Sequence, residues 1–98
     1  MAKAQPSEEI VDEIKKYATE PYSDWYAGIA RRARKRLFTA HRVSENGGRW
    51  IFRKAHTNAN ARVAESALHA AGFQGGPGGG KPKTRKVYAY KITSTTVE

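Results

Sequence analysis

The spacing of apolar residues predicts a helix near the start of the chain. Between residues 8 and 19, apolar side chains recur every three or four positions, which is the spacing of one helix face. Ser7 precedes this stretch as a helix cap, and Pro21 follows its end. Two glutamates lie in the first turn, where the helix dipole favours negative charge. The predicted buried stripe is Ile10, Ile14, Tyr17 and Ala18.

A strand, a turn and a second helix are predicted next. Residues 22–27 are rich in aromatic side chains, which favours an extended conformation. Gly28 permits a turn after this stretch. A helix then runs to about residue 41, with many cations on its surface. Its predicted buried side is Ile29, Ala33, Leu37 and Ala40.

The rest of the chain predicts two strands and one helix. A loop at residues 44–48 leads to a strand over residues 49–54. Thr57 or Asn58 caps a third helix, which Gly72 ends. The predicted stripe of this helix is Val63, Ala64, Ala67, Leu68 and Ala71. Residues 74–86 form a loop rich in glycine and lysine, and the alternating residues 87–92 form the clearest strand.

This order of elements predicts an α+β fold. We expect a small, mainly antiparallel sheet of about three strands flanked by three helices, in a single domain over residues 1–98. A chain of this length buries only a thin core, so its few large apolar residues are expected to be used there. Core packing is therefore the favoured interpretation of Trp25, Trp50 and Phe52, and base stacking is the alternative.

The charge of the chain predicts a polyanionic partner. The formal net charge is +9, and it is unevenly distributed. Residues 1–25 hold three lysines and six acids, or −3, whereas residues 26–98 hold fifteen cations and three acids, or +12. The acidic segment either competes with nucleic acid for the basic face or forms a solvated helix, and the second interpretation is favoured. The residues expected to contact nucleic acid are Arg31, Arg32, Arg34, Lys35, Arg42, Lys81, Lys83, Arg85 and Lys86.

The absence of certain residue types and segments excludes several classes. The chain contains no cysteine, which excludes disulfides and thiolate zinc sites. No segment approaches the roughly 20 apolar residues of a membrane span, and the N-terminus lacks the apolar run of a signal peptide. We therefore expect a cytoplasmic protein without a membrane partner.

Three residues have the chemistry that cleavage of a phosphodiester requires. Tyr26 can orient or deprotonate a water molecule, and Arg36 offers a fixed set of donors to phosphate oxygens. Glu65 is the only acid between residues 46 and 97, and a carboxylate binds Mg²⁺ or Mn²⁺. The alternatives for Glu65 are an ion pair with a nearby arginine and simple exposure to water.

The segment Tyr26-Ala27-Gly28-Ile29, followed by Arg36-Leu37, resembles the second half of a GIY-YIG nuclease motif. In that family a strand ends in Tyr-x-Gly, a helix presents a catalytic arginine about ten residues later, and a further helix supplies one metal-binding glutamate. The resemblance covers residues 22–92. It implies DNA binding and metal-dependent cleavage, with Tyr26, Arg36 and Glu65 in these three roles and Mg²⁺ or Mn²⁺ as the cofactor.

The chain departs from the family where the first strand should be. The family has a strand with its own glycine and tyrosine before Tyr26, and here an acidic helix occupies that place. The C-terminal strand would fill the gap, which would make Tyr88 or Tyr90 the stand-in. His41 and Gly28 are auxiliary candidates. The alternatives are a binding protein of the same fold without catalysis and a small RNA- or ribosome-associated protein.

Overall fold

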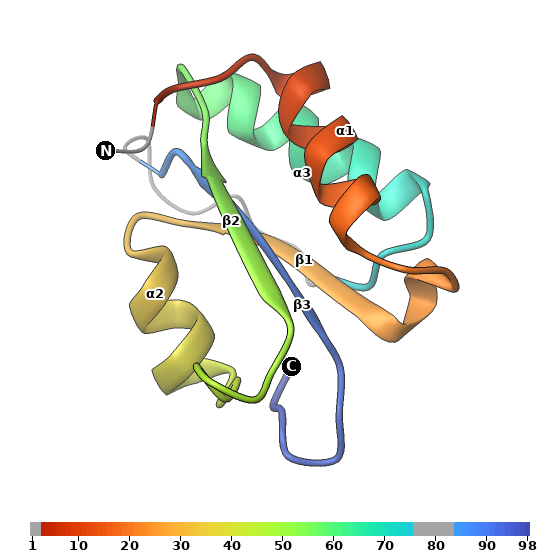
Figure 1. The fold of residues 1–98 in the computed structure, drawn as a ribbon. Coiled ribbons are helices and arrows are strands. Elements are labelled where there is room, and N and C mark those ends of the chain that lie inside the picture. Colours follow the sequence, from red (N-terminus) through yellow and green to blue (C-terminus); the bar gives the residue numbers. More distant parts are fainter. Residues whose placement is uncertain (1–2, 76–83) are drawn as a thin grey trace.

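A computed structural model describes residues 3–75 and 84–98, and it confirms the α+β fold (Figure 1). The sheet has three antiparallel strands in the order β1-β3-β2. The last strand in the sequence is therefore the central one, and it pairs with both others. In chain order the elements are α1 (Ser7–Tyr17), the 3₁₀ turn η1 (Tyr22–Asp24), β1 (Trp25–Ala30), α2 (Ala33–Lys35), the π-helical turn η2 (Arg36–Ala40), β2 (Trp50–Lys54), α3 (Asn58–Ala70) and β3 (Lys86–Lys91).

Helices cover both faces of the sheet. Figure 1 shows α1 and α3 together on one side and α2 on the other. Because side chains alternate along a strand, each strand contributes to both layers. Trp25, Ala27 and Val87 face α1 and α3, whereas Tyr88 and Tyr90 face α2. The chain thus builds two thin cores, and the three tyrosines of β1 and β3 all belong to the α2 side.

The strand β1 begins and ends three residues later than predicted, and the predicted turn at Gly28 is wrong. Gly28 and Ile29 pair with Tyr88 and Val87 of β3, and the strand continues to Ala30. Since β1 lies between two helical layers, it is buried on both faces and reads as a continuous apolar run. Such a run cannot be distinguished from the start of a helix by its period.

The three helices follow the predicted pattern with local corrections. α1 begins at Ser7 itself, after Pro6, and Ser7 does not cap it. The cap of α3 is Thr57, whose hydroxyl accepts a hydrogen bond from the N–H of Asn60 at 3.0 Å. Val63 is 57% exposed and Ala40 is exposed, so neither belongs to a buried stripe. The side of α3 that packs on the sheet consists of Ala61, Ala64 and Leu68.

The acidic helix α1 lies on the side of the sheet opposite α2 (Figure 1). Its acids make local ion pairs: Asp12 with Lys16 at 3.1 Å, and Glu13 with Arg53 of β2 at 2.6 Å. This placement favours the solvated-helix interpretation, because α1 does not reach the basic face formed by α2.

Candidate functional site

Tyr88 lies across Gly28 on the α2 side of the sheet. A Cβ atom built on Gly28 would be 2.7 Å from the Tyr88 hydroxyl oxygen and 2.8 Å from Cζ, which is closer than real Cβ contacts allow. The tyrosine ring therefore occupies the space that any side chain at residue 28 would need. The requirement for glycine here comes from this close approach and not from a turn.

A buried hydrogen bond joins Tyr88 to His41. His41 Nε2 lies 2.8 Å from the Tyr88 hydroxyl, and His41 Nδ1 lies 2.6 Å from the carbonyl oxygen of Val97. Because a carbonyl oxygen only accepts, His41 Nδ1 carries the proton. Nε2 of the neutral imidazole then accepts a hydrogen bond from the Tyr88 hydroxyl. His41 is 6% exposed and Tyr88 is 2% exposed. The pair is thus a buried acceptor and donor whose orientation is set by the C-terminal segment.

The π-helical turn η2 brings Arg36 and His41 to one side of α2. The N–H of His41 donates to the carbonyl of Arg36, five residues earlier, at 2.9 Å. In an uninterrupted α-helix, residues five apart lie about 140° apart around the axis. The wider π-helical turn reduces most of the angle between Arg36 and His41. Such turns occur often at functional sites. A regular helix was predicted here, because an inserted residue leaves no mark in the apolar spacing.

Tyr26 joins the same cluster from β1. Its ring stacks on Tyr90, with centroids 5.2 Å apart, and lies 4.8 Å from the ring of His41. Tyr88 and Tyr90 are buried, whereas Tyr26 is only partly buried. Of the three tyrosines on this side of the sheet, Tyr26 is the one that meets solvent.

The charges of Arg36, in η2, and of Glu65, in α3, both act on the Tyr88 phenol. Burial raises the pKa of Tyr88 most; Tyr26 raises it further, the positive charge of Arg36 lowers it, and the negative charge of Glu65 raises it. Both charges therefore lie near enough to act on one phenol. Of the three sequence-predicted catalytic candidates, Tyr26 stacks on Tyr88, with ring centroids 6.3 Å apart, and Arg36 and Glu65 act on Tyr88 through their charges. His41 contacts Tyr88 directly.

The surroundings of Glu65 are partly dry. Burial raises the pKa of its carboxyl group, and the charges of His69 and Arg62 lower it by less. The ion pairs among the described residues do not include Glu65, so the predicted alternative of a pair with Arg62 or Arg36 is not found there. His69, one turn later on α3, lies with Nε2 2.9 Å from the carbonyl oxygen of Ala27. This contact fixes α3 against the edge of β1, beside the cluster.

A single carboxylate fits a divalent cation that keeps most of its water. Within residues 3–75 and 84–98, no group of three or more His, Cys, Asp or Glu side chains could hold a metal. Mg²⁺ is commonly bound by one or two carboxylates, with water and phosphate oxygens completing its shell. Glu65 meets that requirement, and Mn²⁺ takes the same oxygen donors.

The basic residues around α2 fall into two groups. Arg31, Arg32, Lys35 and Arg36 line a pocket of about 380 Å³ together with Ala30, Thr39 and Ala40. Arg34 instead lies over the ring of Trp50 in β2 and pairs at 3.1 Å with Glu45, in the turn before that strand. Only the first group therefore includes a residue, Arg36, whose charge acts on the Tyr88 phenol.

The remaining predicted nucleic-acid contacts are dispersed. Arg42 is exposed and has a positive φ of 57°, and Arg85 donates to the carbonyl of His56 at 3.3 Å. Lys86 lies over the ring of Phe52. Lys81 and Lys83 lie outside the described residues.

The burial of His41 predicts a pH dependence of stability. Burial lowers the pKa of its imidazole below the ordinary 6.5. The hydrogen bond to Val97 and the charge of Glu98 raise this pKa, and the charge of Arg36 lowers it further. Below about pH 6.5 the unfolded chain binds a proton that the folded chain resists. The free energy of unfolding should therefore fall as the pH is lowered from 7 to 5.

Urea unfolding at several pH values measures this effect. A His41→Asn variant is less stable at pH 7 but should lose less stability between pH 7 and pH 5 than the wild type. Glu65 acts in the opposite direction, since its raised pKa favours the folded state at lower pH. Equal pH slopes for the two proteins would show that His41 does not remain neutral in the fold.

Among the described residues, no helix has the length and apolar character needed to cross a bilayer. Comparisons of the chain with protein-family models, with curated proteins and with solved structures find no match.

Proposed function

We propose that this chain binds nucleic acid on its α2 side and hydrolyses phosphodiester bonds with Mg²⁺ or Mn²⁺. The observation that carries the proposal is that the charges of Arg36 and Glu65 both act on the Tyr88 phenol, whose ring lies 6.3 Å from that of Tyr26. A cation for phosphate, a carboxylate for metal and a cluster of phenols are the three components that such a reaction needs. They come from η2, α3 and the two paired strands, so only the folded chain assembles them.

The sheet topology supports a GIY-YIG-like arrangement. The strand β3 lies antiparallel beside β1, where the family places its first strand, and its Tyr88 is paired with Gly28 of the Tyr-x-Gly element. Tyr88 is the better stand-in for the first tyrosine, because it is the register partner of Gly28 and its phenol is the one on which Arg36 and Glu65 act. In this proposal the family's first strand is supplied by the end of the chain instead of by the segment before Tyr26.

Each residue has a defined task in the proposed reaction. A divalent cation held by Glu65 would neutralise charge on the phosphate and lower the pKa of a water molecule. Arg36 donates to the non-bridging phosphate oxygens, which gain charge as the new bond forms. Tyr26, the only partly buried phenol of the three, contacts the attacking water. His41 Nε2 accepts a hydrogen bond from the Tyr88 hydroxyl, and this bond fixes the tyrosines around the water site.

The test is cleavage of supercoiled plasmid and of labelled oligonucleotides with Mg²⁺ or Mn²⁺. We expect nicking that depends on the metal, is abolished by EDTA and weakens as salt is raised, since the phosphate contacts release counterions. Binding should persist in EDTA.

The burial of Tyr88 and His41 favours one other candidate function. With 2% and 6% of their surfaces exposed, these residues could serve only to pack the basic face of a binding protein. Salt-dependent binding without cleavage in either metal would select this function and contradict the nuclease proposal.

A further inference from the structure

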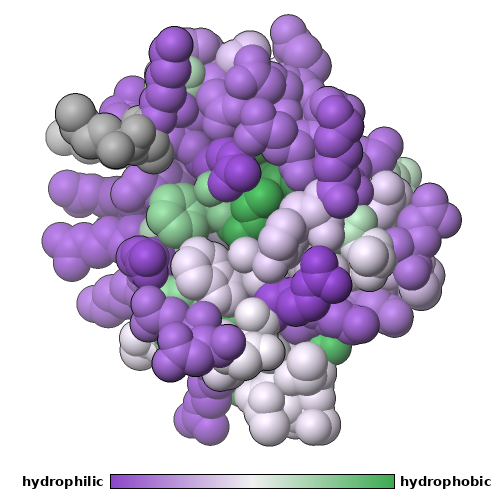
Figure 2. Space-filling model, in the orientation of Figure 1, coloured by the Kyte–Doolittle hydropathy of each residue, from purple (hydrophilic) through white to green (hydrophobic). Residues whose placement is uncertain are grey.

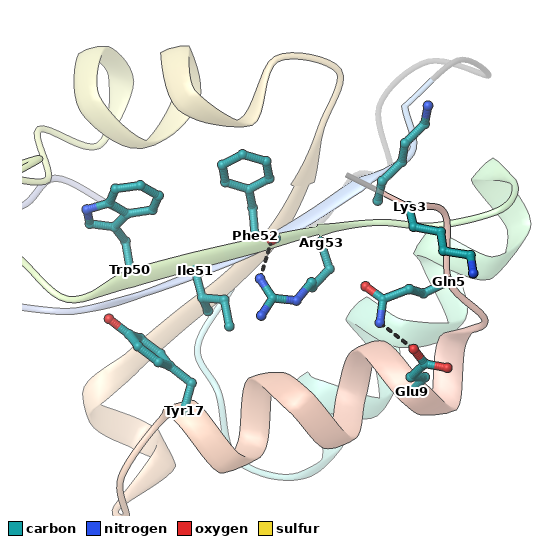
Figure 3. A pocket seen from close by; sticks show the side chains of 9 residues that line it. Lys3, Gln5, Glu9, Tyr17, Trp50, Ile51, Phe52 and Arg53 are labelled. Carbon is teal, nitrogen blue, oxygen red and sulfur yellow. Dashed lines mark hydrogen bonds between the residues drawn. The ribbon is translucent and has the colours of Figure 1, made fainter. Parts of the chain in front are cut away.

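Two aromatic side chains stand on the outer strand of the sheet. Trp50 and Phe52 lie two residues apart on β2, so both point to the α2 side. Their rings are nearly parallel, at 8°, with centroids 6.2 Å apart. Figure 3 shows them side by side on β2, where both line a groove of about 610 Å³ along the outer edge of this strand. We call Trp50 and Phe52 the aromatic platform.

The aromatic platform differs from the core aromatics of the same protein. Trp25 is fully buried, whereas Trp50 and Phe52 are only half-buried although they are among the largest apolar residues of a chain with a thin core. Figure 2 shows hydrophobic and near-neutral surface over β2, with hydrophilic side chains around it. Contiguous exposed apolar surface with a polar rim is typical of a binding site.

Positive charge surrounds the aromatic platform. The guanidinium carbon of Arg34 lies 5.4 Å from the Trp50 ring centre, and the Lys86 ammonium lies 6.0 Å from that of Phe52. Lys3, Arg53 and Lys54 line the same groove, together with the acid Glu9. Arg34 and Arg53 are each paired with a glutamate, so the lysines supply most of the remaining charge.

The aromatic platform connects with the basic pocket around the first turn of α2. In the sheet register, Lys86 is the partner of both Ala30 and Lys54. Ala30 immediately precedes Arg31 and Arg32, which line the basic pocket together with Arg36. One nucleic-acid strand can therefore pass from Arg36 over this end of the sheet to Phe52 and Trp50, over positive charge throughout.

We propose that the aromatic platform binds unpaired nucleobases of a single-stranded segment by stacking. Every base presents a flat face to an aromatic ring, and the lysines beside the rings bind the adjoining phosphates. A duplex hides the faces of its bases, so it would gain from the cations and not from the rings. The inference rests on the proposed nucleic-acid binding and is independent of the proposed cleavage.

The test is fluorescence-anisotropy binding in EDTA at low salt, with labelled single-stranded oligo(dT), oligo(U) and a duplex of equal length. Alanine at a base-stacking residue costs about 1–3 kcal/mol, which is roughly 5- to 150-fold in affinity. We expect Trp50→Ala and Phe52→Ala to weaken single-strand binding by such a factor. Duplex binding should stay within about twofold.

Two controls separate stacking from general packing. Tyr22→Ala removes a half-buried aromatic that stacks on Phe73, on the α1 side of the sheet, and it should leave binding unchanged. Trp50→Phe keeps a ring and should retain single-strand affinity within about threefold even if Trp50→Ala unfolds. In a Trp25→Phe variant, the emission of the remaining Trp50 should be quenched by oligo(dT).

The outcomes distinguish this inference from the proposed function. Equal losses on single strand and duplex, or no loss on either, overturn the stacking site. Binding of the wild type to duplex alone also overturns it but leaves the nuclease proposal intact. Preference for oligo(dT) or oligo(U) identifies DNA or RNA as the source of the strand.

Discussion

The Glu65→Gln variant should bind DNA as tightly as the wild type and cleave it at least about 100-fold more slowly. Glutamine keeps the size of the side chain and removes the anionic oxygen that would hold the cation. Metal assistance contributes several kcal/mol to such reactions, and each 1.36 kcal/mol is a factor of ten in rate. Initial rates of plasmid nicking in Mg²⁺ and in Mn²⁺ measure the loss.

The same variant should be at least as stable as the wild type. Burial raises the pKa of Glu65, so at neutral pH the folded state bears a cost for keeping this carboxyl ionised. A neutral amide relieves that cost, and urea unfolding at pH 7 measures the change. Residues retained at a cost to stability are typical of functional sites.

A matched control is Glu8→Gln, which makes the same chemical change on the first turn of α1, where Glu8 lines a pocket with Val63 and Ala67 of α3 and is not part of the tyrosine cluster. It should cleave at the wild-type rate. Undiminished cleavage by Glu65→Gln would remove this residue from the reaction, and a loss of stability in that variant would point to a structural role instead.

The Gly28→Ala variant should be less stable than the wild type by roughly 2–6 kcal/mol. The new methyl group would meet the Tyr88 ring at 2.7–2.8 Å, and Tyr88 is fixed by its bond to His41. Overpacking of a filled core costs about 1–3 kcal/mol, and a broken buried hydrogen bond adds about 1–3 kcal/mol. Urea unfolding measures the sum, and cleavage should fall as well because the ring that meets Arg36 and Glu65 has moved.

Two variants make this result specific. Gly47→Ala lies in an exposed turn where the nearest atom is the Ser44 hydroxyl at 3.3 Å, so its stability should change by less than about 0.5 kcal/mol. Adding Tyr88→Leu to Gly28→Ala removes the ring and should make the glycine substitution much less costly than in the wild type. A loss below about 0.5 kcal/mol in Gly28→Ala would contradict the close approach of Tyr88.

Most of the elements could be predicted from local pattern. Each of these signals depends on residues close together in the sequence: the buried stripe of Ile10 and Ile14, the cap at Thr57 and the helix end at Gly72. Each lies in or beside the helix for which it was expected. The errors fall where tertiary contacts decide. Ile29 is predicted in a helix but lies in a strand, because a strand that is buried on both faces has no period of two. Val63 is predicted in the buried stripe of the third helix, but its own side chain faces solvent.

The sequence predicts the types of residue in the candidate site, but not the full set of residues that form it. Tyr26, Arg36 and Glu65 were named from their chemistry and spacing, and His41 and Tyr88 entered only as an auxiliary candidate and one of two stand-ins. A side chain such as Tyr88 reads as an ordinary core residue of an alternating strand. Its position across Gly28 depends on a register between residues 28 and 88, which no local pattern specifies.

The sequence alone determined the α+β class, the basic character of residues 26–98 and the residue types available for phosphate chemistry. These depend on periodicity, on charge and on side-chain chemistry, all of which are local. Tertiary structure decided that β3 lies between β1 and β2, that the π-helical turn brings Arg36 and His41 to one side, and that Trp50 stays at the surface while Trp25 is buried. These depend on pairing and packing between residues tens of positions apart, where the free energy of the whole fold selects the arrangement.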